Sequence, residues 1–579
     1  MAELPIDAPF PLDDYITDEW YPSTVLPLPG PVMEEPFGLF TAADSGRFWL
    51  LEGHWSRGMT PLCVSAANDV LWGTQYGANL YQLPPTKGQA ARFVGAHAYV
   101  SDSPCCSEWE VMQRATRVEQ LVGPAIVNFP VMWDARRDSI VAALAHLEGA
   151  DLASMGLAEM RTYLGEFWAF HRWVWEVHFE LMDPLIANYF GFRATCVELG
   201  IDEQDVARFY QGSETKIMET DREVWKLTAA ARDTAVEVVL KANDPSASLA
   251  ALRTSSDDTV KGWLNALDAF LNEYGWRTEG MCDPSLAPWV EDPTPLLAMI
   301  TTFVRNGTDH DFVAAHESAV AERESTLERV RSTLDGDARQ RFEEGLGACR
   351  HANFSWWQEE HNFYLDLRAH IPLRMAALRI GEIVGADRRD DLIYLFRHEL
   401  DHIAAGRISY DAVRDVIVAR RAYYEASRVR RSEMPAVLGT PPGGTDDPIM
   451  KEIFGVDHRL LATVGSVGAD TMSLAGVPAS SGVARGRARV IVEVTDLGDL
   501  EPDEILVCVF TSPNWTPAFA QIAGCVCDTG GALSHTAIVS REYRIPAVCA
   551  TGAATKLIRT GDLIEVDGSA GVVTILERA

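Results

Sequence analysis

The clearest pattern of apolar and polar positions lies near the end of the chain, between residues 522 and 546. The apolar run Ile522-Ala-Gly-Cys-Val-Cys527 has the character of a buried strand. Gly530 and Gly531 follow it, and then a segment compatible with a helix opens at Ser534 and closes before Pro546. The pattern therefore predicts that His535 stands where a strand hands over to a helix.

This position suits phosphoryl chemistry. Glycines allow close approach of the backbone, and the N–H groups of a helix's first turn favour an anion. A neutral imidazole is also a competent nucleophile near pH 7. On residue pattern alone, however, a lone histidine after a Gly-Gly turn is more often structural than catalytic.

Helical periodicity dominates from Asp138 onward, whereas residues 68–131 show a mixed pattern that predicts irregular structure with some strand. Between Met160 and Met182, aromatic and histidine side chains recur at spacings of three and four, which places them on one helical face. They are Trp168, His171, Trp175, His178 and Phe179. Two interpretations stay open: an aromatic core stripe, or one wall of an aromatic-lined pocket that includes His171 and Trp175.

Residues 351–370 form a second candidate, with three histidines, three carboxylates and five aromatic rings within twenty residues. His361 is a candidate general base for a hydroxyl, oriented by Glu360 or Glu359, with Asn362 beside it. An ordinary buried histidine network is the alternative.

Composition narrows the function classes. The 83 acidic and 50 basic residues give a net charge of −33, which disfavours nonspecific attraction to nucleic acid or anionic membranes. The N-terminus lacks the pattern of a signal peptide, and no apolar run approaches the length of a membrane span, so we expect a cytoplasmic protein. The ten cysteines are scattered without zinc-knuckle spacing, which favours reduced thiols.

One extended motif gives the pattern around His535 a more specific meaning. The string Gly530-Gly531-x-x-Ser534-His535-x-Ala537-Ile538-x-Ser540-Arg541-Glu542, followed by Ile545-Pro546-Ala547-Val548, resembles the swivelling phosphohistidine domain of the PEP (phosphoenolpyruvate)-utilising, dikinase-type phosphotransferases. The resemblance runs from about Met472 to Ile575. Where several dikinases have a regulatory Thr two residues before the His, this chain has Leu533, so regulation through that Thr is not expected.

The resemblance implies a role for His535 as carrier of a phosphoryl group from a nucleotide site to an acceptor site. It also implies that groups at Gly530, Gly531, Ser534 and Thr536 hold the phosphoryl oxygens. A short segment with His54 and Arg57, ending in Thr60-Pro61, resembles a part of the acceptor domains in this family, although a plain turn is the alternative.

From these features we predict a multidomain chain: a mainly α-helical N-terminal acceptor domain and a C-terminal α/β swivelling phosphohistidine domain. The expected segments are an extended arm (1–45), the acceptor domain (46–434), a hinge rich in proline and glycine (435–470) and the mobile phosphohistidine domain (471–579).

No Gly-x-x-x-x-Gly-Lys loop is present, the first 435 residues do not read as an ATP-grasp domain, and about forty residues follow His535, too few for a pyruvate-binding barrel. The arrangement resembles rifampicin phosphotransferase without its ATP-grasp domain and, more closely, the histidine-bearing subunit of phenylphosphate synthase and related two-component kinases. The resemblance thus implies a separate ATP-grasp subunit that uses ATP and Mg²⁺ to phosphorylate His535, and transfer to phenol or a 4-hydroxyphenyl ketone.

Three alternatives remain. The acceptor hydroxyl can belong to an antibiotic, or the chain can be a phosphocarrier that binds no small acceptor. The third is a zinc hydrolase, because His398-Glu399-Leu-Asp401-His402 is a literal His-Glu-x-x-His. We expect no metal there, since no third ligand follows at a known spacing and relatives carry a similar segment without a metal.

Overall fold

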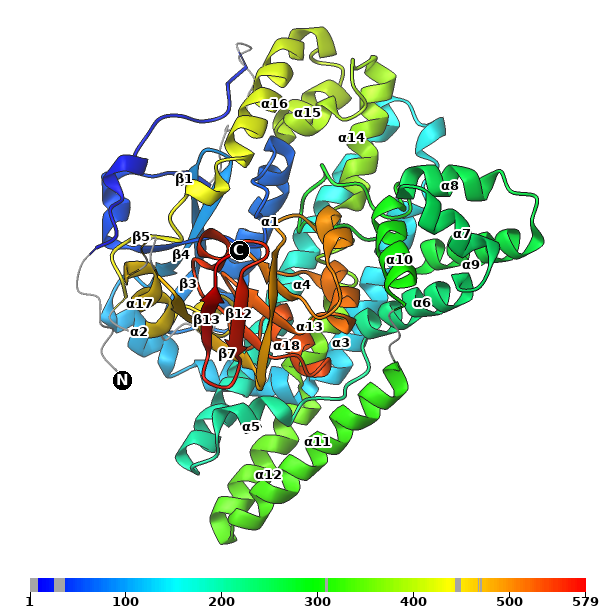
Figure 1. The fold of residues 1–579 in the computed structure, drawn as a ribbon. Helices are drawn as coiled ribbons and strands as arrows, with labels where there is room; N and C mark the ends of the chain where they lie inside the picture. Colours follow the sequence, from blue (N-terminus) through cyan, green and yellow to red (C-terminus); the bar gives the residue numbers. More distant parts are fainter. Residues whose placement is uncertain (1–8, 25–36, 308–310, 443–448, 467, 469–470) are drawn as a thin grey trace. The chain divides into compact units, whose positions relative to one another are not determined.

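The computed structural model describes residues 9–24, 37–307, 311–442, 449–466, 468 and 471–579 (Figure 1). They form two compact units. Unit 1 comprises Met1–Asn188, Gly280–Leu286 and Tyr364–Asp447; unit 2 comprises Tyr189–Glu279, Ala287–Phe363 and Pro448–Ala579. The long helix α4 (Leu157–Glu198) begins in unit 1 and ends in unit 2.

Unit 1 combines a five-stranded sheet with long helices. The sheet has the order β1-β3-β4-β2-β5, in which only β1 and β3 are parallel. Its strands are β1 (Phe37–Leu39), β2 (Phe48–Leu51), β3 (Thr86–Val94), β4 (His97–Pro104) and β5 (Val437–Gly439). Its other helices are α1 (Pro61–Leu80), α2 (Glu108–Ala115), α3 (Val118–Glu148), α14 (Ile371–Val384), α15 (Arg397–Ala404) and α16 (Arg414–Arg428).

The prediction of irregular structure over residues 68–131 was wrong. This stretch holds most of α1, the hairpin of β3 and β4, α2 and the start of α3. Thr60 caps α1 by accepting a hydrogen bond from the Cys63 N–H, with Pro61 at the first helical position. The misleading signal was glycine inside α1: a Cβ on Gly73 would lie 2.6 Å from the Trp175 carbonyl oxygen of α4, so glycine there permits close helix packing.

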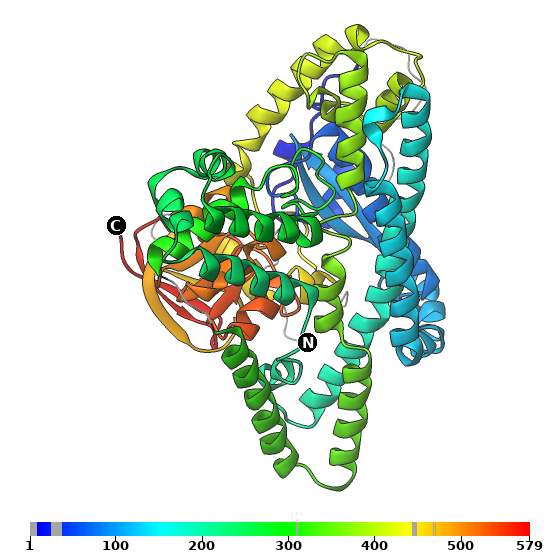
Figure 2. The ribbon, with the colours of Figure 1, turned by 90° about the vertical axis from the view of Figure 1, so that its right-hand side faces the viewer.

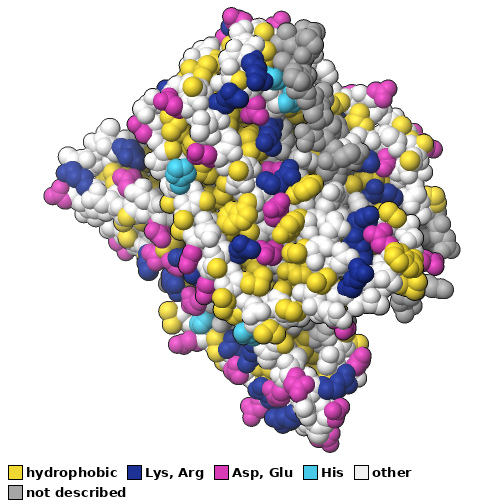
Figure 3. Space-filling model, turned by 180° about the vertical axis from the view of Figure 1, so that it is seen from behind, with side chains coloured by type: hydrophobic (Ala, Val, Ile, Leu, Met, Phe, Trp, Pro, Cys, Tyr) yellow, Lys and Arg dark blue, Asp and Glu magenta, His cyan; other side chains and the backbone are white. Residues whose placement is uncertain are grey.

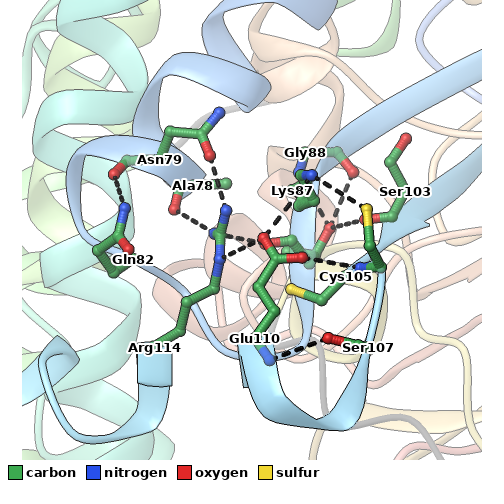
Figure 4. A network of polar contacts seen from close by, with 12 residues as sticks. Ala78, Asn79, Gln82, Lys87, Gly88, Ser103, Cys105, Ser107, Glu110 and Arg114 are labelled. Carbon is green, nitrogen blue, oxygen red and sulfur yellow. Dashed lines mark hydrogen bonds and ion pairs between the residues drawn. The ribbon is translucent and has the colours of Figure 1, made fainter. Parts of the chain in front are cut away.

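A buried arginine joins α2 to the end of α1 and the start of β3. The Arg114 guanidinium bonds Asn79 Oδ1 at 2.8 Å and Glu110 Oε1 at 3.2 Å, and it donates to backbone carbonyls in both neighbouring elements (Figure 4). These carbonyls are those of Ala78, Leu83 and Thr86. A single guanidinium group thus binds carbonyls of α1, of the loop after it and of β3.

Unit 2 contains an eight-stranded sheet of order β6-β13-β12-β8-β9-β10-β11-β7. The four strands β8 to β11 are parallel to one another, and the remaining pairings are antiparallel. The bounds are β6 (Ser473–Ala475), β7 (Val477–Ser480), β8 (Val483–Val490), β9 (Ile505–Cys508), β10 (Gly524–Cys527), β11 (Ala547–Cys549), β12 (Leu563–Asp567) and β13 (Val572–Glu577). Strands β9, β10 and β11 are wholly buried, as expected of parallel strands covered on both faces.

The helices of unit 2 form a packed group and a hairpin. In the packed group, Trp225 of α6 stacks on Phe303 of α10 with ring centres 4.5 Å apart. Helices α11 and α12 lie side by side (Figures 1 and 2), joined by an Arg331–Glu343 ion pair of 2.7 Å, and their surface carries both signs of charge (Figure 3). The helices are α5 (Glu203–Arg208), α6 (Lys216–Ala231), α7 (Ala235–Ala242), α8 (Pro245–Arg253), α9 (Asp258–Tyr274), α10 (Thr294–Asn306), α11 (Phe312–Thr333), α12 (Gly336–His351), α13 (Phe354–Asn362), α17 (His458–Ser466), α18 (His535–Glu542) and α19 (Ala554–Leu557).

The chain thus has a helix-rich N-terminal region and a C-terminal sheet domain, but the divisions differ from those predicted. Residues 46–434 do not form one compact unit, because 189–279 and 287–363 group with the C-terminal sheet. Within 1–45, the described residues include β1 and Phe10, whose N–H donates to the Gly439 carbonyl, so this part joins the sheet and is not simply an extended arm. Within 435–470, β5 is a strand of unit 1.

No helix in the described part of the chain has the length and apolar character that crossing a bilayer requires.

Candidate functional site

The predicted handover from strand to helix at His535 is confirmed. Strand β10 ends at Cys527, and α18 begins at His535. Ser534 caps the helix, with its Oγ accepting from the Ala537 N–H at 3.4 Å and donating to the Gly531 carbonyl at 2.8 Å. His535 is therefore held rigidly at the first position of the helix.

Both ring nitrogens of His535 have polar neighbours. Nδ1 lies 2.9 Å from Glu359 Oε2, and Nε2 lies 3.3 Å from Thr516 Oγ1. An ionised carboxylate only accepts hydrogen bonds, so the proton of a neutral ring belongs on Nδ1 and the lone pair on Nε2. Because an imidazole attacks through its lone pair, the geometry makes Nε2 the nucleophilic atom.

Glu359 contacts a different histidine from the one that the sequence predicted. It was predicted as one of two groups that orient His361, yet its carboxylate faces His535, 176 positions later in the chain. Both residues are buried, with exposed fractions of 4% and 3%. No local spacing could have linked them, since the contact joins α13 to α18.

The N–H groups of the loop between β10 and α18, which were predicted to bind phosphoryl oxygens, donate to backbone carbonyls of the protein. The N–H groups of Gly530, Gly531 and Leu533 donate to the carbonyls of residues 454, 453 and 452, at 3.3, 2.7 and 2.8 Å. The Ser534 N–H donates to Gly531, and the Thr536 hydroxyl lies 2.7 Å from Thr511 Oγ1. In this conformation these groups have protein partners, so phosphoryl binding by Gly530, Gly531, Ser534 and Thr536 stays a prediction.

A buried charged group lies beside the loop that carries Thr516. The Arg277 Nε donates to Asn514 Oδ1, while its Nη1 and Nη2 lack hydrogen-bond partners in the described part of the chain. Burial lowers the pKa of Arg277 to about 10. Burial also raises the pKa of Glu279, which accepts from Ser512 and Trp515, to about 7. These residues fix the loop at 512–516 and hence the hydroxyl beside Nε2.

The predicted acceptor residues Glu360, His361 and Asn362 lie at the end of α13 in unit 2. Glu360 accepts from the Lys216 N–H at 2.8 Å, which ties it to the start of α6. His361 stacks on Trp357 with ring centres 4.1 Å apart, and burial lowers its pKa to about 3. Such a weak base is poorly matched to taking a proton from a hydroxyl near pH 7. Asn362 is buried beside it.

The other predicted acceptor residues, His171, Trp175, His54 and Arg57, lie in unit 1. His171 Nδ1 is 2.9 Å from Asp69 Oδ2, and its Nε2 accepts from the Trp175 indole N–H at 3.2 Å. Both His171 and Trp175 are almost wholly buried, which fits the core-stripe interpretation. His54 Nδ1 lies 2.6 Å from Glu52; burial opposes protonation of His54, but the Glu52 charge and hydrogen bond raise its pKa overall. Arg57, which follows His54 closely in the sequence, is half-buried.

The His-Glu-x-x-His helix has a structural use for its glutamate. Glu399 accepts two hydrogen bonds from the Arg420 guanidinium, at 2.6 and 2.9 Å, and a third from the Phe396 N–H. Both side chains are about 1% exposed. A carboxylate held in this way does not serve as the general base of a metal site. Among the described residues, neither His398 nor His402 belongs to a group of three possible ligands.

Comparison with known proteins assigns two domains. Residues 182–359 match the model of the rifampicin phosphotransferase fourth domain, and residues 500–571 match that of the PEP-utilising enzyme mobile domain. His535 lies inside the second match, and Glu359 is the final residue of the first. The chain therefore carries a domain of the rifampicin phosphotransferase type and a PEP-utilising mobile domain.

Individual proteins similar to this chain are 28–30% identical to it. It is 30% identical to an uncharacterized phosphotransferase, YvkC, of Bacillus subtilis, over 71% of this chain and 48% of that protein. It is 30% identical to a rifampicin phosphotransferase of Bacillus cereus, over 54% and 34% of the two chains. It is 28% identical to the chondramide synthase cmdD of Chondromyces crocatus, over 92% of this chain and 14% of that protein. The chain thus spans less than half the length of each of these relatives.

Proposed function

We propose that this chain accepts a phosphoryl group on Nε2 of His535 and transfers it to the hydroxyl of a small aromatic molecule, giving an aryl phosphate. The observation that carries the proposal is the 2.9 Å contact between His535 Nδ1 and the Glu359 carboxylate. This contact selects the reactive nitrogen, and the membership of both residues in matched phosphotransferase domains supports it.

In the first step, the Nε2 lone pair forms a bond to a phosphorus atom of the donor while the bond to the leaving oxygen breaks. The ring keeps its Nδ1 proton, so it gains positive charge, and the buried Glu359 carboxylate offsets that charge. The donor is ATP with Mg²⁺, held by an ATP-grasp domain outside these 579 residues on a separate subunit. Water takes the other phosphoryl group, so the overall products are AMP and phosphate.

In the second step, the acceptor oxygen attacks phosphorus. The P–N bond breaks, its electron pair returns to Nε2, and the hydroxyl proton passes to a base at the acceptor site. The phosphoryl group is then on the aromatic oxygen, and His535 is ready for another cycle.

Burial of His535 supports a domain movement between the two steps. The neighbouring cavity, lined by Glu359, Thr516 and Tyr543 among others, has a volume of about 20 Å³. That is room for about one water molecule and not for a nucleotide or an aromatic ring. Donor and acceptor can therefore reach His535 only after the packing around it opens, a movement that a swivelling domain can provide.

For the acceptor we favour phenol or a 4-hydroxyphenyl ketone. An antibiotic hydroxyl is the second candidate, and the similarity to rifampicin phosphotransferases favours it. A phosphocarrier that binds no small acceptor would become phosphorylated on His535. It would transfer the phosphoryl group neither to phenol or a 4-hydroxyphenyl ketone nor to an antibiotic.

The test is intact-mass analysis of this chain with a candidate ATP-grasp partner, ATP and Mg²⁺. We expect an acid-labile gain of one phosphoryl group that is absent from His535→Ala. Phenol, 4-hydroxyacetophenone and rifampicin are then added separately, and loss of the label with formation of one phosphorylated product identifies the acceptor class. Undiminished product formation by His535→Ala would refute the proposal.

A further inference from the structure

A cavity of about 220 Å³ opens in unit 2 beside the loop that joins β10 to α18. Ala532, three residues before His535, and Arg541 of α18 are among its lining residues. Its volume is about eleven times that of the small cavity beside Glu359 and Thr516. The cavity shares no residue with the small one that contains Glu359 and Thr516.

The lining is basic in a strongly acidic protein. Six basic side chains face three acidic ones, although the whole chain carries a net charge of −33. The basic residues are Arg193, Arg208, Lys451, Arg459, Arg541 and Arg544.

Each of the three carboxylates already has a basic partner. Glu452 pairs with Arg193 at 2.8 Å, and Asp457 lies 3.8 Å from Arg459. Glu322 pairs with two arginines, Arg208 at 3.4 Å and Arg544 at 3.5 Å. These pairs offset the acidic charge in the lining.

Arg541 and Lys451 form no ion pair in the described part of the chain, although the charges of Glu542 and Glu359 attract Arg541. Arg541 is 8% exposed, and its Nη1 and Nη2 donate to the carbonyls of Ala479 and Ala532 at 2.8 and 2.9 Å. The Lys451 ammonium lies 5.6 Å from the centre of the Phe190 ring. Both side chains place positive charge at the cavity. Burial of the Arg541 charge is costly, and an anion in the cavity would offset part of that cost.

We propose that this cavity is a binding site for a small phosphorylated anion, separate from the phosphoryl site on His535. Guanidinium groups match phosphate oxygens in geometry, and Lys451 supplies a mobile point charge. Ser481, whose Oγ accepts from Arg208 at 2.6 Å, adds a hydroxyl at the cavity wall. The site does not depend on the phosphotransfer proposed above.

Isothermal titration calorimetry with inorganic phosphate, pyrophosphate and AMP tests the site. We expect saturable binding of at least one of the three to the wild-type chain and to His535→Ala. The double variant Lys451→Gln/Arg544→Gln should bind about tenfold more weakly or not at all, because it loses two charge-assisted contacts. The control Lys226→Gln, an exposed lysine of α6 outside the cavity, should bind as the wild type does.

The outcomes separate the possible sites and ligands. Binding of AMP but not of phosphate or pyrophosphate would identify an organic phosphate as the ligand. Loss of binding in His535→Ala would place the anion at the phosphoryl site and overturn the inference. Equal binding by the double variant, or no binding by the wild type up to about 10 mM of each anion, would also overturn it.

Discussion

At the scale of single residues, the site depends on groups whose partners lie far away in sequence. Glu359 sets the tautomer of His535, and Glu279 holds the loop that presents Thr516. The motif identified His535 correctly as the residue at the helix start. It could not identify either glutamate, because nothing in a sequence shows which carboxylate a histidine will face.

Replacing Glu359 by Gln tests the tautomer argument. The amide preserves shape but removes the charge and can donate toward Nδ1, which would leave the proton on Nε2. We expect phosphorylation of His535 to slow by at least about 100-fold, measured by intact mass against time with the ATP-grasp partner. Glu360→Gln, which changes the adjacent carboxylate, should retain nearly the wild-type rate; equal rates for both variants would contradict the role of Glu359.

The raised pKa of Glu279 predicts a pH dependence of stability. Its ordinary value is 4.5 and its folded value is about 7, so between these values the folded protein holds a proton that the unfolded chain has lost. Stability therefore falls as pH rises through this window, because the charged carboxylate is disfavoured by burial. Thermal unfolding midpoints of the wild type and Glu279→Gln should diverge between pH 5 and pH 8, with the variant relatively more stable at higher pH. Glu273→Gln, at an exposed position of α9, is the control, and a pH-independent difference for Glu279→Gln would refute the account.

At the scale of elements, the loop between β10 and α18 is held in place because its N–H groups donate hydrogen bonds to the carbonyls of residues 452–454. The sequence predicted the strand, the turn and the helix, because these follow from local patterns. It did not predict this second segment, because backbone groups carry no sequence signal. As a result, the same glycines that suggested anion binding serve close packing here.

Gly531→Ala tests that packing. A Cβ at this position would collide with the Glu452 carbonyl, so we expect a loss of about 1–3 kcal/mol in the free energy of unfolding, measured by chemical denaturation. Gly262→Ala is the matched change in α9, where a Cβ meets nothing within 4 Å. It should stabilise the protein by about 0.5–1 kcal/mol, as alanine does within a helix. A neutral Gly531→Ala would show that the loop is not tightly packed.

At the scale of the whole molecule, the C-terminal sheet domain packs on helices of its own unit and covers His535. Tyr543 Oη donates to Asp221 at 3.2 Å, the Gly212 N–H donates to Glu542 at 3.1 Å, and Arg193 pairs with Glu452. Further polar contacts join the same surfaces, among them those of Arg277 with Asn514 and of Glu279 with Trp515.

The covered state predicts a difference in histidine reactivity. Diethyl pyrocarbonate acylates accessible neutral imidazoles, so His535, at 3% exposure, should react much more slowly than His146, whose side chain is 70% exposed. Tyr543→Phe removes one docking hydrogen bond and should speed modification of His535 but not of His146. Peptide mass spectrometry measures both histidines in one sample. Comparable rates in the wild type would indicate that His535 is exposed most of the time.

The sequence by itself determined the local identity of this protein: the strand and glycine turn before His535, the helix after it, and the resemblance to PEP-utilising phosphotransferases. These features depend on side-chain periodicity and on residues close together in the chain. The tertiary structure alone decided that residues 189–279 and 287–363 group with the C-terminal sheet, that Glu359 faces His535, that Glu360 accepts from the Lys216 N–H, and that Glu399 pairs with Arg420. The physical reason is that partner choice is set by the packing of distant elements, where burial makes an unpaired charge costly and so fixes which groups must meet.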